Sequence, residues 1–245
     1  MDIFGNSDIG KRRDNNEDSF RCGRLEDGSL WAVVCDGMGG AAGGEIASRI
    51  AADMVAGKIG KCYRREFEVS SLRNMLASAI ITANVSIIDK VEENKDLKGM
   101  GTTIVAAVIK DGVALIAHVG DSRAYVINKE KIVQITKDHS LVQAMLDDGQ
   151  ITEEEYRNST IKNIILKCLG AEEIKDNDYI DYNVSFLKDG DSILICSDGL
   201  SNCVSDEEMK RIVNDYESPG ECVSALIEAA NNGGGLDNIT VVLMK

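Results

Sequence analysis

Residues 29–37 read SLWAVVCDG, a nearly continuous apolar run that ends in an aspartate and a glycine. A strand that is covered on both faces has this pattern, because neither of its sides meets water. Asp36 therefore stands where a rigid strand gives way to a loop, and side chains at such points can project beyond the packed core. The segment predicts a fold in which a strand lies between two layers and carries an acidic side chain at its end.

Three further aspartates have small or flexible neighbours in the same way: Gly120-Asp121, Asp198-Gly199 and Asp237-Asn238. Counting Asp36, three of the four follow strand-like apolar runs. Several carboxylates gathered at one point repel one another unless a cation neutralises them, so we expect a site for hard metal ions. The chain has only two histidines and no CxxC pair among its seven cysteines, which leaves oxygen ligands. Oxygen ligands indicate magnesium or manganese, with calcium as a less favoured alternative.

The length of 245 residues allows one large domain or two small ones. Because the chain has a single proline and no Gly/Ser tract that resembles a linker, we expect one domain over residues 1–245. A net charge of −14 argues against a nucleic-acid or anionic-membrane partner. The N-terminal residues lack a secretory pattern, and no apolar run approaches the ~20 residues that span a bilayer, so a cytoplasmic protein is expected. The absence of heptads favours a monomer.

Periodicity predicts strands and helices in a definite order. Strands are expected at residues 2–9, 19–25, 29–35, 102–109, 113–119, 124–128, 131–134, 179–186, 191–196 and 239–244. Helices are expected at residues 45–59, 72–91, 206–214 and 220–231. The four strands between residues 102 and 134 are interpreted as an antiparallel meander, and a helix-prone insertion follows at residues 140–170. Helical pairs on either side of antiparallel strands favour layers over an alternating parallel fold.

The glycine-rich segment at residues 36–44, DGMGGAAGG, allows a second interpretation. Gly37, Gly39 and Ala42 satisfy the dinucleotide-binding pattern GxGxxA, and Asp53 lies at a suitable distance. A dinucleotide fold requires its helix to return directly to a parallel strand, whereas two helices are expected here before the next strand. We therefore favour a role in which glycine lets the backbone turn sharply and brings the Gly37 carbonyl close to a bound ion.

Seven motifs, in this order, resemble those of the metal-dependent protein phosphatase family, type 2C, in its bacterial form. They are RDNNED at 13–18, DGMGG at 36–40, GTT at 101–103, HVGDSR at 118–123, TKDHS at 136–140, SDG at 197–199 and DN at 237–238. The resemblance covers almost the whole chain. It implies an α+β fold, a four-layer α-β-β-α sandwich of two antiparallel sheets flanked by helices, with a flap at about residues 140–161.

The resemblance also implies a centre for two metal ions between the sheets. Asp36 would bridge both ions, Asp198 and Asp237 would complete the protein ligands of one, and the Gly37 carbonyl would bind the other. Many bacterial members hold a third ion, which would use Asp121 together with Asp198. The second ion would be supported by Glu17 or by Asp18, directly or through water; the motif leaves this choice open.

This chemistry needs no serine or cysteine nucleophile. Two divalent ions about 3.5–4 Å apart can share a water, lower its pKa from 15.7 toward about 7 and hold the hydroxide in line with phosphorus. Arg13 would grip the phosphate oxygens bidentately, in a way that a lysine could not. Without the motif, Arg13 would be interpreted as an ordinary exposed residue of the basic run at 11–13.

Other motif residues have structural interpretations beside functional ones. Asp121 could be a turn aspartate. His139 could donate a proton, but we favour a structural role in which it caps a helix beginning near Leu141 and orients the following loop, and we favour structure for His118 too. The threonines at 102–103 are expected to pack and hydrogen-bond below the site.

Two departures from the family pattern stand out. Met38 occupies a position where some members carry a histidine, the proposed acid for the leaving alkoxide, and methionine cannot donate a proton. Residues 158–159 read Asn-Ser where bacterial members often have His-Pro. The flap could therefore be ordered differently in this chain.

The expected function is a magnesium- or manganese-dependent phosphatase of phosphoserine and phosphothreonine in proteins, acting in signal transduction. The resemblance implies a bacterial-type serine/threonine kinase and its targets as the counterpart. The alternative is a catalytically silent module of the same fold that only binds phosphoproteins. Such a module should lack one of the carboxylates, whereas Asp36, Asp198 and Asp237 are all present together with Arg13.

Overall fold

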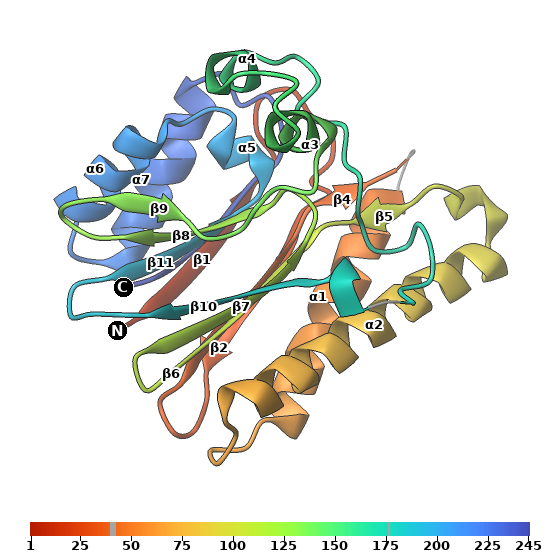
Figure 1. Cartoon of the computed structure of the whole chain (residues 1–245), viewed down its shortest axis with the longest axis horizontal. Coiled ribbons are helices and arrows are strands. Elements are labelled where there is room, and N and C mark those ends of the chain that lie inside the picture. Colours follow the sequence, from red (N-terminus) through yellow and green to blue (C-terminus); the bar gives the residue numbers. More distant parts are fainter. Residues whose placement is uncertain (40–42, 176) are drawn as a thin grey trace.

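Two antiparallel sheets lie face to face at the centre of the protein, and a pair of helices covers the outer face of each (Figure 1). The structure is a computed structural model that describes residues 1–39, 43–175 and 177–245. Its four layers confirm the predicted α-β-β-α sandwich.

Each sheet has five strands. Sheet I has the order β1 (Ile3–Asp8), β12 (Ile239–Met244), β11 (Ser192–Cys196), β8 (Arg123–Ile127) and β9 (Ile132–Gln134). Sheet II has the order β10 (Asp181–Phe186), β7 (Val113–Val119), β6 (Ile104–Lys110), β3 (Leu30–Cys35) and β2 (Ser19–Arg24). A short separate ladder joins β4 (Gly37–Met38) to β5 (Gly101–Thr102). The strands earliest and latest in the sequence, β1 and β12, are paired along their full length.

The long helices are divided between the two sheets. Sheet II carries α1 (Gly43–Cys62) and α2 (Val69–Glu93), and sheet I carries α6 (Asp206–Asp215) and α7 (Pro219–Asn232). The shorter helices are α3 (Leu141–Asp147), α4 (Glu153–Arg157), α5 (Asp198–Ser201), and the 3-10 turns η1 (Lys95–Leu97) and η2 (Asn177–Tyr179). Serine or threonine caps begin α3, α4, α6 and α7, because a side-chain oxygen there accepts an otherwise unpaired helix N–H. Helix α3 is capped by Ser140 and not, as expected, by His139.

The core consists of three apolar layers, one between the sheets and one under each helical pair. β3 contributes to two of them, because Ala32 and Val34 face sheet I while Val33 and Cys35 face α1 and α2. This double burial explains the continuous apolar run that precedes Asp36.

Helix α2 is long and apolar enough, by length and composition, to cross a membrane. Its apolar side, which includes Leu76, Ile80 and Ile87, is fully buried against α1 and sheet II. Packing in the core therefore accounts for its composition.

The predicted meander is wrong in one connection. β6 pairs with β7, and β8 pairs with β9, but β8 lies in sheet I beside β11. The chain crosses between the sheets at Gly120, whose φ of 107° is readily adopted only by glycine. A side chain at Gly120 would also come within 2.6 Å of Thr103. The crossing places Asp121 at the junction of the two sheets.

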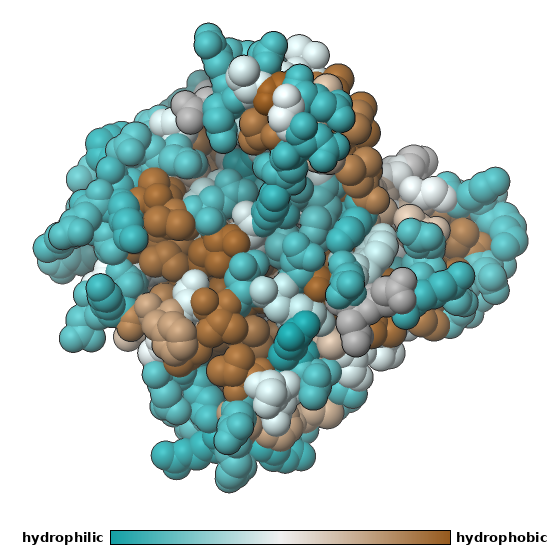
Figure 2. Space-filling model, viewed as in Figure 1, coloured by the Kyte–Doolittle hydropathy of each residue, from teal (hydrophilic) through white to brown (hydrophobic). Residues whose placement is uncertain are grey.

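The insertion forms a flap above one end of the sandwich, with α3 and α4 at the top of Figure 1. Its two ends meet in an isolated bridge between Ser140 and Ile165. At the sides of the sheets, β9 and β10 are edge strands, and Figure 2 shows apolar surface gathered over them. Val133, Val184 and Phe186 are the exposed apolar side chains of these strands.

Candidate functional site

Asp36 is fixed from both sides of its backbone at the end of β3. Its N–H donates to Oγ1 of Thr103 at 3.0 Å, and its carbonyl accepts from Oγ1 of Thr102 at 2.9 Å and from the N–H of Thr103 at 2.9 Å. The two threonines therefore hold the acidic residue in place from below, as the sequence predicted.

Asp198 and Asp237 are brought together by neighbouring strands of sheet I. Asp198 follows β11 and begins α5, and Asp237 precedes β12, which pairs antiparallel with β11. The glycine after Asp198 allows this approach, since a Cβ on Gly199 would lie only 2.0 Å from the carbonyl oxygen of Asn238. The side chains of Asp121 and Asp198 line the same small hollow beneath the flap.

Burial and neighbouring charges raise the pKa values of four aspartates at this site. Burial raises the pKa of Asp36 well above 3.8, and the charges of Asp18 and Asp198 raise it further. Burial is also the main cause that raises the pKa of Asp18 to about 7, of Asp121 to about 8 and of Asp198 to about 6. The charge of Asp237 adds to the increase at Asp18, Asp36 and Asp198. We call Asp18, Asp36, Asp121, Asp198 and Asp237 the acidic cluster.

The acidic cluster has the properties of a cation site. Within the described part of the chain, one buried oxygen of each of Asp18, Asp121 and Asp198 has no hydrogen-bond partner. A buried carboxylate oxygen normally has a partner, because leaving it without one is costly. Hard divalent cations bind such oxygens and remove the mutual repulsion, so these residues fit magnesium or manganese.

Glu17 and Asp18 border the cluster in different ways. Asp18 is 8% exposed and accepts a 2.7 Å hydrogen bond from Oγ of Ser197, the residue before Asp198. The carboxyl group of Glu17 lies close to Gly44, and the charge of Arg13 acts on its pKa, which burial raises overall.

Arg13 reaches the acidic cluster. Its Nη2 lies 2.7 Å from Oδ2 of Asp237, and this hydrogen bond is the main cause that raises the pKa of Arg13. About half of the Arg13 side chain is exposed, so the guanidinium can meet a ligand that comes from solvent.

Asn238 was not singled out by the sequence, although it organises the segment that carries Arg13. Its Nδ2 donates to the carbonyl oxygens of Ile9 and Asn15 at 2.9 Å, and its Oδ1 accepts from the N–H of Glu17 at 2.8 Å. The only signal was its place beside Asp237 in the final motif.

Gly37 is required for close packing. A Cβ at this position would lie 2.2 Å from the carbonyl oxygen of Gly44 and 2.4 Å from that of Glu17. The expected sharp turn is at Gly39 instead, where φ is 130°. Ala42, part of the dinucleotide pattern, lies outside the described residues.

His139 holds the segment that carries Asp121. Its backbone N–H donates to the Gly120 carbonyl at 2.9 Å, and its Nδ1 accepts from the Gly120 N–H at 3.1 Å. Burial lowers the pKa of His139 to about 4, so the ring is neutral at physiological pH and its proton is on Nε2. His118 stacks on this ring. Both histidines therefore have structural roles, but His139 holds the Asp121 segment and does not cap the helix as we expected.

His118, His139 and Asp181 have candidate ligand atoms within 4.8 Å of one another. The two imidazole planes differ by only 15°. A metal ion bound to an imidazole nitrogen lies in the plane of that ring. Because the two stacked rings are nearly parallel, their planes do not intersect close to His118 and His139, so one ion cannot lie in both planes. The hydrogen bond from Gly120 also leaves a proton on the nitrogen of His139 that would have to bind. This conformation does not fit a cation.

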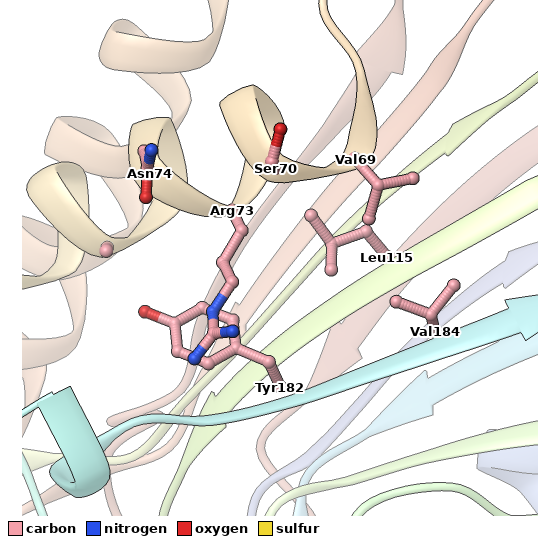
Figure 3. A pocket seen from close by; sticks show the side chains of 8 residues that line it. Val69, Ser70, Arg73, Asn74, Leu115, Tyr182 and Val184 are labelled. Carbon is pink, nitrogen blue, oxygen red and sulfur yellow. The ribbon is translucent and has the colours of Figure 1, made fainter.

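A separate groove of about 600 Å³ lies between α2 and β10 (Figure 3). Arg73 extends from α2 over the ring of Tyr182, with 4.4 Å between the guanidinium carbon and the ring centre. No carboxylate lines this groove in the described part of the chain, so its chemistry differs from that of the acidic cluster.

Comparisons with known proteins show what the whole chain is similar to. The family model described as Protein phosphatase 2C matches residues 5–229. The serine/threonine phosphatase stp of Listeria monocytogenes is 36% identical over 239 residues, which cover 98% of this chain and 93% of that protein.

Solved structures are similar over the same length. The crystal structure of the serine/threonine phosphatase Stp1 from Staphylococcus aureus matches with a TM-score of 0.91 and 34% identity, over 99% of this chain and 94% of that chain. The catalytic domain of the phosphatase PstP in complex with 2 manganese ions matches with a TM-score of 0.84 and 34% identity, over 99% of this chain and 96% of that chain. From the family match and the extent of these similarities, the chain belongs to the protein phosphatase 2C family.

Proposed function

We propose that this protein is a metal-dependent phosphatase that hydrolyses phosphoserine and phosphothreonine in proteins. The observation that carries the proposal is the acidic cluster, in which three buried carboxylate oxygens lack partners among the described residues and an exposed arginine lies beside them. Family membership and the names of the relatives support the same activity. The chain would act as a single domain over residues 1–245.

Different residues of the acidic cluster would bind different cations. Asp36 would bridge two ions, Asp198 and Asp237 would complete the ligands of one, and the Gly37 carbonyl would bind the other. The structure of PstP with 2 manganese ions supports manganese as a suitable ion. When bound, such a pair supplies a water whose pKa is lowered toward about 7, which can attack phosphorus.

Arg13 would bind the phosphate. In the structure its guanidinium pairs with Asp237, and a cation on Asp237 would compete for the same carboxylate charge. The guanidinium would then be able to present its two parallel N–H groups to the phosphate oxygens and to stabilise the charge that develops on them. Because Met38 has no proton to give, departure of the alkoxide would need metal-bound water, the third ion, or substrates with better leaving groups.

Asp121 would hold a third ion together with Asp198, since both line the hollow beneath the flap and Asp121 has an unpartnered oxygen. The second ion would be supported by Glu17 or by Asp18, directly or through water, and the buried oxygen of Asp18 that lacks a partner among the described residues keeps Asp18 a candidate. The natural substrates would be targets of a bacterial-type serine/threonine kinase. We place the protein in the cytoplasm as a monomer.

The test is phosphate release from peptides that carry phosphoserine, phosphothreonine or phosphotyrosine, with manganese titrated in. We expect release from the first two, dependence on the ion and loss of activity with a chelator. Asp36→Asn and Asp198→Asn should each reduce turnover by at least about 100-fold, because each removes a charged ligand. Full turnover in either variant would contradict the proposal, and phosphopeptide binding without any turnover would favour the silent module.

A further inference from the structure

The flap projects above one end of the sandwich, so specific contacts must hold it in place. Its base is fixed by backbone contacts: the N–H of Leu141 donates to the Ile164 carbonyl at 2.8 Å, and the N–H of Leu166 donates to the His139 carbonyl at 2.7 Å. These contacts hold the two ends of the flap but not α4, which lies between them.

Tyr156 joins α4 to the body of the protein. Its hydroxyl donates to Oδ2 of Asp138 at 3.2 Å and accepts from Nη2 of Arg123 at 3.1 Å. Burial and the charge of Asp138 raise the pKa of Tyr156 to about 12, so the hydroxyl keeps the proton that it donates. One phenol group therefore contacts both members of a charged pair.

The charged pair is itself rigid. Arg123 binds Asp138 through Nε at 2.9 Å and through Nη2 at 2.6 Å, and their side chains are only 14% and 6% exposed. Gln134 donates a further hydrogen bond of 3.0 Å to Asp138. A bidentate and buried pair of this kind fixes the position of any group bound to it.

The pair lies next to the acidic cluster. Arg123 begins β8 two residues after Asp121, and the charges of Arg123 and Asp138 both act on the pKa of Asp121. Tyr156, Asp121 and Asp198 line the same hollow beneath the flap. The position of α4 is thus set directly beside two of the expected cation ligands.

We propose that Tyr156 is a positioning residue that holds the flap closed against the Asp121 side of the site by joining α4 to the Arg123–Asp138 pair. This inference rests on the proposed phosphatase function for its consequence but not for the contact itself. Beyond α4 the flap presents the apolar side chains of Ile164 and Leu166, which are 42% and 55% exposed. A phosphopeptide has side chains beside its phosphate that such a surface can contact, whereas a small aryl phosphate has none.

The test compares Tyr156→Phe with the unmodified protein, because the substitution keeps the ring and removes only the hydroxyl. Tyr216→Phe is the matched control, since Tyr216 is an exposed tyrosine just beyond α6. Hydrogen–deuterium exchange in the metal-free protein should become at least about tenfold faster over residues 152–159 in Tyr156→Phe, and stay unchanged in β6 and in the control.

The second measurement is a comparison of substrates with manganese present. The ratio of kcat/KM for a phosphothreonine peptide to that for p-nitrophenyl phosphate should fall about fivefold in Tyr156→Phe, through an increase in KM for the peptide. Flap exchange within twofold of the unmodified protein would overturn the positioning role, whatever the activity. Faster exchange with an unchanged ratio would overturn the consequence for substrates. An unmodified protein without phosphatase activity would overturn the proposed function and leave the exchange result as the test of the contact.

Discussion

The approach of Gly199 to Asn238 makes a sharp prediction about how the acidic cluster is assembled. The substitution Gly199→Ala would put a Cβ 2.0 Å from the Asn238 carbonyl oxygen, whereas ordinary contacts begin at 3.4 Å. The two segments must therefore separate by more than 1 Å, and they carry Asp198 and Asp237, two of the expected cation ligands. The obstacle is backbone, which cannot move aside as a flexible side chain would.

Two effects of this separation can be estimated. Overpacking of a tight contact costs about 1–3 kcal/mol of folding free energy. A displacement of about 1 Å in a reacting group can cost about 100-fold in rate. We therefore expect Gly199→Ala to lower the melting temperature by several degrees and to reduce both manganese affinity and kcat, the latter by at least about 100-fold.

The assay combines thermal unfolding, calorimetric titration with manganese, and phosphate release. Gly57→Ala is the matched control, because Gly57 is inside α1 with no atom within 4 Å of a Cβ at that position, and alanine there should be neutral or stabilising by about 0.5–1 kcal/mol. The reasoning is refuted if Gly199→Ala binds manganese and turns over substrate within twofold of the unmodified protein.

Three other predictions concern charge. Arg13→Lys should keep the charge but lose the bidentate geometry, so kcat/KM should fall about tenfold or more; kinetics within twofold of normal would make Arg13 a bystander. Asp121→Ala should leave two ions bound in a manganese titration while turnover falls, and unchanged turnover at limiting manganese would exclude a third-ion role. The metal-free protein should lose stability as pH rises from about 4 through 8, because the folded state retains protons on Asp18, Asp121 and Asp198 that the unfolded chain releases. The free energy of unfolding should fall by about 1.4 kcal/mol per pH unit for each such proton. A free energy of unfolding that does not change with pH, measured with a chelator present, would count against this prediction.

The sequence predicted the structure well wherever neighbouring residues in the chain carry the pattern. The apolar run before Asp36, the helical spacing within α2 and the strands β7 and β12 all appear where they were predicted, because side-chain periodicity follows burial directly. The expected cation ligands were recognisable for a similar reason, since each stands at a strand end or beside a glycine.

The sequence was less informative wherever a distant segment decides the outcome. β8 has the same composition in either sheet, and only the backbone at Gly120 and the pairing with β11 assign it to sheet I. No local sequence pattern predicts contacts between residues that are far apart in the chain. Arg13 with Asp237 and Tyr156 with Asp138 are two such contacts. The short helix α5 was missed because four residues carry too little periodicity.

The pairing of β1 with β12 has a consequence for the order in which the protein matures. β12 lies between β1 and β11, so sheet I stays split into two pieces until residues 239–244 leave the ribosome. Asp237 immediately precedes this strand, and therefore a nascent or prematurely terminated chain would have no complete set of acidic ligands. Hydrolytic capacity should consequently arise only after residues 239–244 have been synthesised, in a single step that closes sheet I and creates the ion site together.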